Sequence, residues 1–132
     1  MNEDAFTTPV QVRFRDLDPM KHVNNGVYMT YLELARAEYF RAVLGEELQD
    51  IPTVLATITI DFRHEITRED DVEVAIAVPK LGESSIPMVY EIRASGELAA
   101  EAESVLVHTG DDGRSAPMPE AWREGIEAYE GL

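Results

Sequence analysis

The chain has 132 residues, with 26 acidic against 11 basic side chains, a formal net charge of −15 and no cysteine. This length predicts one domain over residues 1–132, and the absence of cysteine excludes disulfides, thiolate nucleophiles and Cys-ligated metal sites. Because nucleic acids and anionic membranes bind basic surfaces, we expect neither as a partner. Two explanations fit the acidic excess: a solvated surface that keeps the protein dispersed, or adaptation to a high-salt cytosol.

The N-terminal stretch MNEDAFTTPVQVRF lacks the basic and apolar segments of a signal peptide. No apolar run in the chain approaches the roughly 18 residues that a membrane span requires. We therefore expect a soluble, cytoplasmic protein.

Alternating apolar and polar residues predict a first strand over 9–15. Its apolar positions are Val10, Val12 and Phe14. The next stretch, 16–25, is rich in Asp, Asn and Pro and is typical of a turn. The beginning of the chain is thus expected to be a strand that leads into a polar turn.

A long helix is predicted to follow, from about Asn25 to Gly45. Asn24 or Asn25 is placed to cap its N-terminus, and Gly45 fits the position just beyond its C-terminus. Large apolar residues recur at helical spacing on more than one side of this segment. We therefore expect the helix to be mostly buried.

Four further strands with alternating patterns are predicted after the helix, and short turns connect the last three. They cover 54–62, 71–78, 84–94 and 97–109. Short turns make neighbouring strands antiparallel. Pro87 removes one ladder donor from the third of these strands, so it belongs at an edge, at a bulge or at a non-bonded position.

Pro119 suits the start of a last helix, which we expect to pack outside the main body. Trp122, Ile126 and Tyr129 share one face of it. A long helix that is apolar on several sides needs a curved sheet to cover it. The predicted fold is α+β, with an antiparallel sheet of about five strands wrapped around one long central helix and a short C-terminal helix.

Asp16, Asp18 and His22 lie within seven residues, just before the N-terminus of the long helix. Free N–H groups there stabilise negative charge. A carboxylate beside them can activate water or attack a thioester carbonyl while the N–H groups hold the oxyanion. The structural alternative is an Asp-stabilised turn, a His22 bond to a backbone carbonyl and Asn caps on the helix. The composition of this stretch, taken alone, favours the structural alternative.

The run DLDPMKHVNNGVY followed by YLELARAEYF resembles the hotdog-fold acyl-CoA thioesterases of the 4-hydroxybenzoyl-CoA thioesterase superfamily. The predicted strand order matches that fold, and PMPEAWREGI is similar to the C-terminal segment of its bacterial and archaeal members. The resemblance implies hydrolysis of acyl-CoA to free acid and CoA, with no metal and no separate cofactor. HVNN also looks like plant acyl-ACP thioesterases, but these carry an Asn where this chain has Met20.

The resemblance also implies roles for individual residues. Asp18 would be the catalytic carboxylate, acting as nucleophile or general base, while His22 and Asn25 would position or polarise the thioester. Asp16 would lie at the substrate side of the site, although we favour a role in orienting the turn. Candidate oxyanion donors are the backbone N–H groups of Gly26, Val27 and Tyr28, and the Tyr28 side chain fits the core equally well.

Coenzyme A carries several negative charges, so an acidic protein must gather its few cations to bind it. The resemblance implies contacts from Arg63 and His64 after the second strand, and from Lys80 and Ser84 beside the next hairpin, usually across a dimer interface. Surface salt bridges explain Arg63 equally well.

Glu33 and Glu38 on the helix offer a fallback carboxylate, as in hotdog enzymes that place the acid there. Each can instead form an exposed pair with the arginine three residues later, Arg36 or Arg41. We favour the exposed pairs.

Two other functions are compatible with the resemblance. Hotdog hydratases and dehydratases usually separate their Asp and His by five residues, whereas His22 is four residues after Asp18 and six after Asp16. A non-catalytic acyl-CoA-binding protein is the second alternative. Hotdog domains generally pair through their sheets, so we predict a homodimer that can assemble further into a tetramer.

Overall fold

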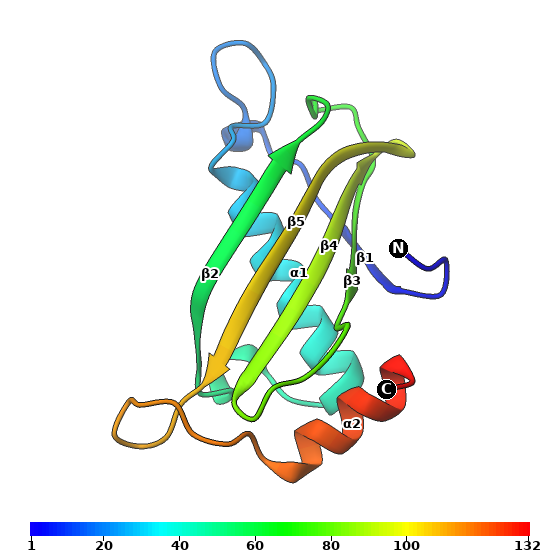
Figure 1. The fold of residues 1–132 in the computed structure, drawn as a ribbon. Coiled ribbons are helices and arrows are strands. Elements are labelled where there is room, and N and C mark those ends of the chain that lie inside the picture. Colours follow the sequence, from blue (N-terminus) through cyan, green and yellow to red (C-terminus); the bar gives the residue numbers. More distant parts are fainter.

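Five antiparallel strands wrap around one long helix in the computed structural model, which describes residues 1–132 (Figure 1). The strand order across the sheet is β1-β3-β4-β5-β2. This confirms the predicted α+β architecture. In chain order the elements are β1 (Phe6–Val10), the 3₁₀ turn η1 (Phe14–Asp16), α1 (Val27–Leu44), the 3₁₀ turn η2 (Leu48–Asp50), β2 (Thr53–Phe62), β3 (Val72–Ala77), β4 (Ser85–Ala94), β5 (Glu97–His108) and α2 (Glu120–Glu130).

The core lies between α1 and the concave face of the sheet. The buried side chains of α1 lie on one broad face, and alternate residues of β3, β4 and β5 meet them. The prediction of a mostly buried helix is therefore wrong, because the opposite face is solvent-exposed and includes Leu34, which is 48% exposed. Each large apolar side chain buried there contributes about 1.5–3 kcal/mol. α1 ends at Gly45, whose φ of 68° is the left-handed conformation that glycine adopts most readily.

The four predicted strands after the helix are confirmed to within one residue at each end. Pro87 lies inside β4, which is an inner strand. However, β3 pairs with β4 only from Val89 onward, so Pro87 lies beyond the end of β3. Its missing N–H therefore costs no bond to that neighbour.

The predicted first strand over 9–15 is wrong in its position. β1 ends at Val10, and Phe14 begins a 3₁₀ turn in which its side chain is 80% exposed. The cause is local: Asp16 Oδ2 accepts the Arg13 N–H at 2.9 Å, and the Asp16 N–H donates to the Arg13 carbonyl at 2.9 Å. These bonds compete with a sheet ladder and turn the chain.

The prediction that the last helix packs outside the main body is only half right. α2 lies at one end of the molecule, beside the C-terminal end of α1 (Figure 1). Trp122 and Ile126 are nevertheless buried members of the core. Tyr39 of α1 donates its hydroxyl hydrogen to Glu130 at 2.7 Å. α2 therefore closes the lower end of the core.

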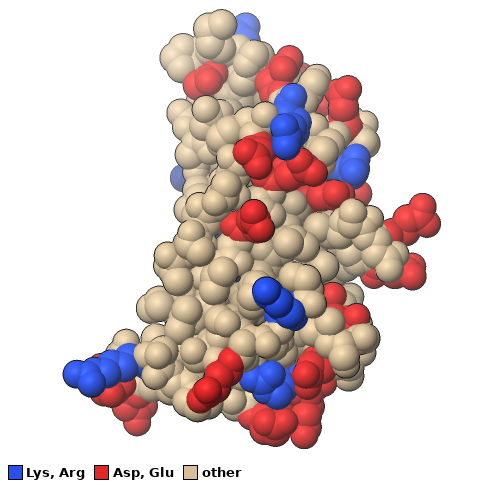
Figure 2. All heavy atoms as spheres, in the orientation of Figure 1, with Lys and Arg blue, Asp and Glu red and all other residues tan.

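Uncharged residues make up most of the face seen in Figure 2, and acidic side chains gather in its upper right part and along its lower edge, with Lys and Arg scattered among them. Neither α1 nor α2 is long and apolar enough to cross a lipid bilayer.

Candidate active site

Asp18 lies in a tight turn that its own carboxylate holds closed. Its Oδ1 accepts the backbone N–H groups of Met20 at 2.9 Å and of His22 at 3.2 Å. Lys21 completes the turn with φ of 65°, an uncommon conformation for a residue with a side chain. The other oxygen, Oδ2, has no hydrogen-bond partner in the chain. The bonds to Oδ1 thus fix the orientation of the carboxylate, and Oδ2 remains available to accept a proton or to attack a substrate.

Asp16, two residues earlier, is buried and only 2% exposed. Its Oδ2 accepts the Arg13 N–H at 2.9 Å and the Tyr31 hydroxyl at 2.8 Å, and its Oδ1 lies 3.6 Å from the Arg13 guanidinium. The Tyr31 pKa is raised well above its usual range, mainly by burial and then by this bond to Asp16. Asp16 does not line the cleft that Asp18 faces. Its placement matches the turn-orienting role and not direct contact with a substrate.

A cleft of about 280 Å³ opens beside Asp18 at the N-terminal end of α1. Four segments line this cleft: the turn before α1, α1 itself, β2 and the segment after β2. The cleft therefore brings together Asp18, His22, Asn25, Arg63 and His64. The residues that line it are Asp18, His22, Val23, Asn25, Tyr28, Phe62, Arg63, His64 and Glu65. The sequence-predicted catalytic residues therefore share one cleft.

A larger hollow of about 590 Å³ lies between the end of β1 and the loop before β3. Its lining includes Glu69, Asp70, Asp71 and Glu73 but only one cation, Arg68. An anionic substrate would be repelled by this lining. The smaller cleft is therefore the candidate active site.

The backbone N–H groups around the start of α1 differ in whether they are free. Gly26 donates to the Asn24 side chain at 2.8 Å, Val27 to the Asn24 carbonyl at 2.9 Å, and Tyr28 to the Asn25 carbonyl at 3.3 Å. These bonds occupy all three predicted oxyanion donors. The N–H of Asn25 has no partner in the chain, and Asn25 lines the cleft. A free N–H in this stretch thus belongs to a residue of the cleft that is one position earlier than the predicted donors.

Neither Asn caps the helix as predicted. α1 begins at Val27 with Gly26 in the cap position, and no side chain bonds its first turn. Asn24 instead closes the preceding turn through its bond to Gly26. This leaves the positive end of the helix dipole without a side-chain acceptor close to the cleft.

The two basic residues at the cleft, Arg63 and His64, are both exposed, and each lies within bonding distance of an acidic side chain. Arg63 donates to Glu101 on β5 at 2.8 Å, which is a surface salt bridge. His64 Nδ1 lies 2.8 Å from the Glu65 carbonyl and Nε2 lies 3.1 Å from Glu97. The bond to the Glu65 carbonyl, with help from the charges of nearby acids, raises the pKa of His64.

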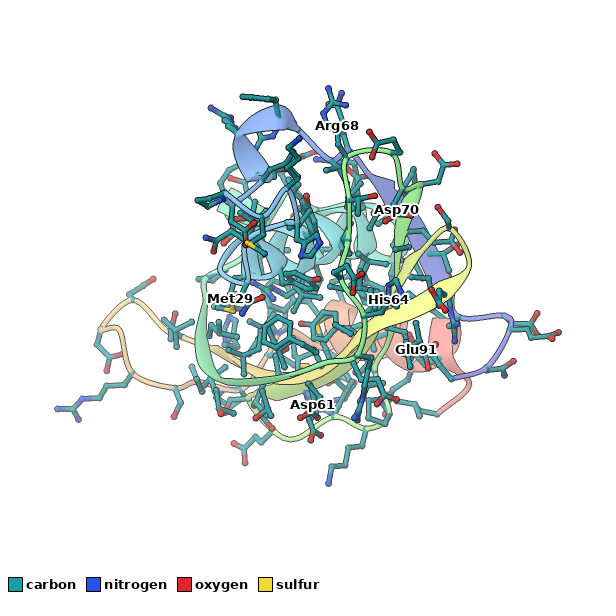
Figure 3. All side chains as sticks on the ribbon, turned by 90° about the horizontal axis from the view of Figure 1, so that it is seen from above. Met29, Asp61, His64, Arg68, Asp70 and Glu91 are labelled. Carbon is teal, nitrogen blue, oxygen red and sulfur yellow. The ribbon has the colours of Figure 1, made fainter.

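The segment that carries these cations is held in place by Asp70. Its carboxylate accepts the Thr67 N–H at 2.8 Å and the Ser95 hydroxyl at 2.9 Å, and the Thr67 bond holds the pKa of Asp70 below its usual range. The backbone of Thr67 in turn forms a bridge with His22. Figure 3 looks down on this end, where Arg68 projects outward away from His64.

Comparison with known proteins identifies the family. Residues 12–126 match the model of the thioesterase-like superfamily. The chain belongs to this superfamily. Among solved structures, it resembles a thioesterase from Thermus thermophilus in complex with coenzyme A and zinc, with 44% identity, a TM-score of 0.89, and coverage of 96% of this chain and 94% of that one. The protein is therefore a thioester hydrolase with a hotdog fold.

The chain is also similar to two more distant proteins. A predicted thioesterase from Bacillus stearothermophilus is 25% identical, with a TM-score of 0.85, over 94% of this chain and 95% of that one. An uncharacterised protein, YsmA of Bacillus subtilis, is 26% identical over 87 residues, which are 65% of this chain and 59% of that protein. The matched stretch thus spans less than two thirds of YsmA.

Lys80 and Ser84 of the thioesterase do not join the cleft within one chain. They lie in the β3–β4 connection, and Lys80 lines a different hollow together with Thr57, Thr59 and Glu103. That connection is at the opposite end of the sheet from the turn before α1 (Figure 1). A single copy of the enzyme therefore brings only Arg63 and His64 to Asp18.

The fallback carboxylates of the thioesterase behave differently from each other. Glu38 bonds Arg41 on the helix surface, as the exposed-pair alternative predicts. Glu33 is exposed and forms no pair with Arg36, because the Arg36 side chain is buried in the core. Neither glutamate lines the cleft with Asp18.

Proposed function

We propose that the thioesterase hydrolyses acyl-CoA to free acid and CoA, with Asp18 as the catalytic carboxylate. One observation carries the proposal: the free oxygen of Asp18 and the free N–H of Asn25 belong to residues that line the same cleft. A carboxylate and an oxyanion donor are the two groups that thioester hydrolysis requires. The solved complex of the Thermus enzyme with coenzyme A supports the choice of thioester.

In the general-base route, Asp18 Oδ2 removes a proton from water as the water oxygen attacks the thioester carbonyl carbon. The carbonyl oxygen becomes an oxyanion and accepts a hydrogen bond from the Asn25 N–H, aided by the dipole of α1. Collapse of the tetrahedral intermediate breaks the C–S bond, and the proton held by Asp18 passes to the departing thiolate. No metal and no separate cofactor takes part in this route.

In the nucleophilic route, Asp18 Oδ2 attacks the carbonyl carbon itself and displaces the CoA thiolate, which leaves a mixed anhydride. Water then hydrolyses the anhydride. A single turnover in ¹⁸O-labelled water with excess enzyme distinguishes the routes. Label in the Asp18 side chain indicates an anhydride, because water can attack the aspartyl carbon, whereas the general-base route labels only the acid product.

His22 and Asn25 position the thioester in this proposal. The backbone of His22 is fixed twice, by the Asp18 carboxylate and by the bridge to Thr67. His22 lines the cleft, where its side chain can contact the thioester. Arg63 and His64 lie at the same cleft and bind the CoA phosphates or pantetheine.

We also propose that two copies pair through β2. This strand is an edge of the sheet, so its outer N–H and C=O groups lack a partner strand. Exposed apolar side chains accompany it on β2 and on the adjacent part of α1, namely Met29, Leu34, Val54, Leu55 and Phe62. Antiparallel two-fold pairing would place the Lys80 end of one copy beside the Asp18 end of the other, so Lys80 and Ser84 could act on CoA across the interface.

Light scattering after size-exclusion chromatography tests this pairing. We expect a dimer or a tetramer, and we expect Val54→Glu to shift the mass toward one chain because it adds charge to the apolar edge. A monomeric wild-type protein at both low and molar salt would contradict the pairing.

Thiol release from a panel of short, long and aromatic acyl-CoAs tests the reaction. We expect wild type to hydrolyse at least one of them and Asp18→Asn to lose that turnover. Asp111→Asn, the same change in an exposed loop at the other end of the molecule, is the matched control and should retain full activity. Coenzyme A binding without hydrolysis of any substrate would favour a binding protein instead.

We further propose that the protein works in the cytoplasm and that its acidic surface suits a high-salt cytosol. With a net charge of −15, carboxylates repel one another in dilute buffer, and salt screens this repulsion. The melting temperature should therefore rise from dilute buffer to molar KCl. Equal melting temperatures in the two buffers would leave only the explanation of a solvated surface.

A further inference from the structure

Arg36 is a buried cation with no carboxylate partner. It lies in the middle of α1, is only 6% exposed, and is the one lysine or arginine that the core buries. Its guanidinium donates to the Tyr90 hydroxyl at 3.3 Å, and that hydroxyl lies 2.5 Å from Ser104 Oγ. No acidic side chain pairs with it.

An uncompensated charge in a protein core is costly, so buried arginines are normally paired with an anion. The hydroxyl of Tyr90 is neutral, and its bond to Arg36 is long. Arg36, Tyr90 and Ser104 nevertheless converge from α1, β4 and β5 on one place in an otherwise apolar core. A few convergent polar groups among apolar side chains are the usual composition of a ligand pocket.

This polar group is not sealed from outside. No buried side-chain nitrogen or oxygen of the protein lacks a hydrogen-bond partner, so the guanidinium nitrogens of Arg36 that have none must reach solvent. Exposed apolar side chains line the seam between α1 and β2. Phe62 on the inward face of β2 is 46% exposed and Met29 on α1 is 38% exposed. Met29 and Arg36 are seven residues apart, which places them on nearly the same helix face.

The same seam begins at the Asp18 cleft. Phe62 lines that cleft and packs edge-on against Tyr28, with ring centroids 4.9 Å apart. Along β2 the inward residues after it are Ile60 and Ile58, and Ile58 is the cross-strand partner of Ser104. Tyr28 and Arg36 are eight residues apart on α1, a rise of about 12 Å. Phe62, Ile60 and Ile58 therefore form an apolar track on β2 that runs from the Asp18 cleft toward Ser104.

We propose that Arg36, with the hydroxyls of Tyr90 and Ser104, binds a carboxylate at the far end of the acyl group. The preferred substrates would then be CoA thioesters of dicarboxylic acids, whose chain follows the track while the thioester lies at Asp18. This inference rests on the proposed function. The carboxylate supplies the charge that Arg36 lacks, and the guanidinium and hydroxyls replace the water that the carboxylate loses.

Hydrolysis of matched acyl-CoA pairs tests the proposal. Each pair has the same chain length and ends either in a carboxylate or in a methyl group, in a series from succinyl- to sebacoyl-CoA. In wild type, kcat/KM should be higher for the dicarboxylic member at the length that reaches Arg36. Arg36→Met should lower this preference by about 10- to 100-fold, the usual effect of losing a hydrogen bond to a charged group. Its kcat/KM for the methyl-ended member should not fall.

Arg41→Met is the control, because Arg41 is exposed on the same helix and pairs with Glu38 and Glu47. It should leave the preference unchanged. Tyr90→Phe keeps the ring and removes one hydroxyl, so it should lower the preference less than Arg36→Met. An equal preference in wild type and Arg36→Met would overturn the proposal. A change from dimer to monomer in Arg36→Met would also overturn it, because the missing anion would then belong to a second copy.

Binding of a free dicarboxylate separates this inference from the proposed function. The Arg36 Nε–H resonance of ¹⁵N-labelled enzyme should shift when suberate is added, and should shift much less with octanoate. If no acyl-CoA is hydrolysed but suberate shifts this resonance, the proposed function fails and the anion site is upheld. If acyl-CoAs are hydrolysed but suberate leaves the resonance unmoved, the anion site is overturned.

Discussion

Asp16 and Asp18 belong to one short turn, yet their carboxylates have opposite surroundings. Asp16 is buried, and both its oxygens face donors or cations of the chain, Arg13 and Tyr31. Asp18 lies at the cleft, bonds two backbone N–H groups through one oxygen and leaves the other free. A carboxylate whose bonds are all internal supports the fold, whereas one that is fixed and half free can react. We call the part of the turn around Asp16 the buried side and the part around Asp18 at the cleft the open side. The bonds of Asp16 on the buried side thus fix the position of Asp18 on the open side.

The largest expected effect is a loss of activity, without a loss of stability, when Asp18 on the open side is replaced. Asp18→Asn keeps an oxygen that can accept the Met20 and His22 N–H groups but removes the base, so kcat should fall by about 10²- to 10⁴-fold. The free energy of unfolding should change by less than about 0.5 kcal/mol, as for other surface substitutions. Steady-state thiol release and urea unfolding measure the two quantities. A destabilised Asp18→Asn variant would show that Asp18 also supports the fold.

On the buried side, we expect the replacement of Asp16 to lower the stability of the fold. Asp16→Ala leaves the Arg13 N–H and the Tyr31 hydroxyl without their acceptor, which should lower the free energy of unfolding by about 1–3 kcal/mol. Urea denaturation measures the loss, and Asp18→Ala is the matched control. Because water can replace the acceptor at the more exposed Asp18 position, its loss should be smaller. Equal losses for the two variants would contradict the division between the sides.

Two tyrosines of α1 allow a finer test of the same difference. Tyr31 donates to Asp16, whereas the Tyr28 hydroxyl at the cleft has no partner in the chain. Burial raises the pKa of both phenols, and in Tyr31 the bond to Asp16 adds to the rise. Tyr31→Phe should lower the free energy of unfolding by about 1 kcal/mol, and Tyr28→Phe should lower it by less. Thermal and urea unfolding of both variants check the order, and a larger loss in Tyr28→Phe would contradict it.

The fold was predictable where alternation has a single physical cause. β3, β4 and β5 each bury one face, so their apolar residues repeat with period two, and the boundaries follow from the turns. The prediction of the first strand failed because the apolar alternation continues through Phe14, whereas β1 ends at Val10 and Phe14 already belongs to the 3₁₀ turn that Asp16 closes. Periodicity does not reveal a side chain that bonds the backbone three residues earlier.

The sequence predicted which residues line the candidate site, but it did not predict which backbone N–H groups there lack a hydrogen-bond partner. The sequence places Asp18, His22 and Asn25 together, because one turn carries all three. It does not reveal that Asn24 occupies the N–H groups of Gly26 and Val27, since this depends on the path of the turn. Nor does it reveal the burial of Arg36, because the spacing that pairs Glu38 with Arg41 is the same for Glu33 and Arg36.

The smallest expected effect is a pH dependence of stability and of KM that arises from His64 at the cleft and does not involve Asp16. His64 lines the cleft, and its bond to the Glu65 carbonyl, together with the charges of Glu97 and other acids, raises its pKa above the ordinary 6.5. A raised pKa means that the folded protein binds the proton more tightly than the unfolded chain does. The associated stability is fully present below pH 6.5 and is lost as the pH rises through the raised value.

If His64 binds CoA phosphate as a cation, KM for acyl-CoA should rise by a few-fold over the same pH window, in which the imidazolium disappears. His64→Gln should flatten that rise. Glu97→Gln removes one cause of the raised pKa and should move the rise to lower pH, as an NMR titration of the His64 ring can verify. Asp16 does not contact His64. The difference in free energy of unfolding between wild type and Asp16→Ala should therefore be the same below and above the pH range in which His64 loses its proton. A pH dependence of KM that survives in His64→Gln would assign it to another group at the cleft.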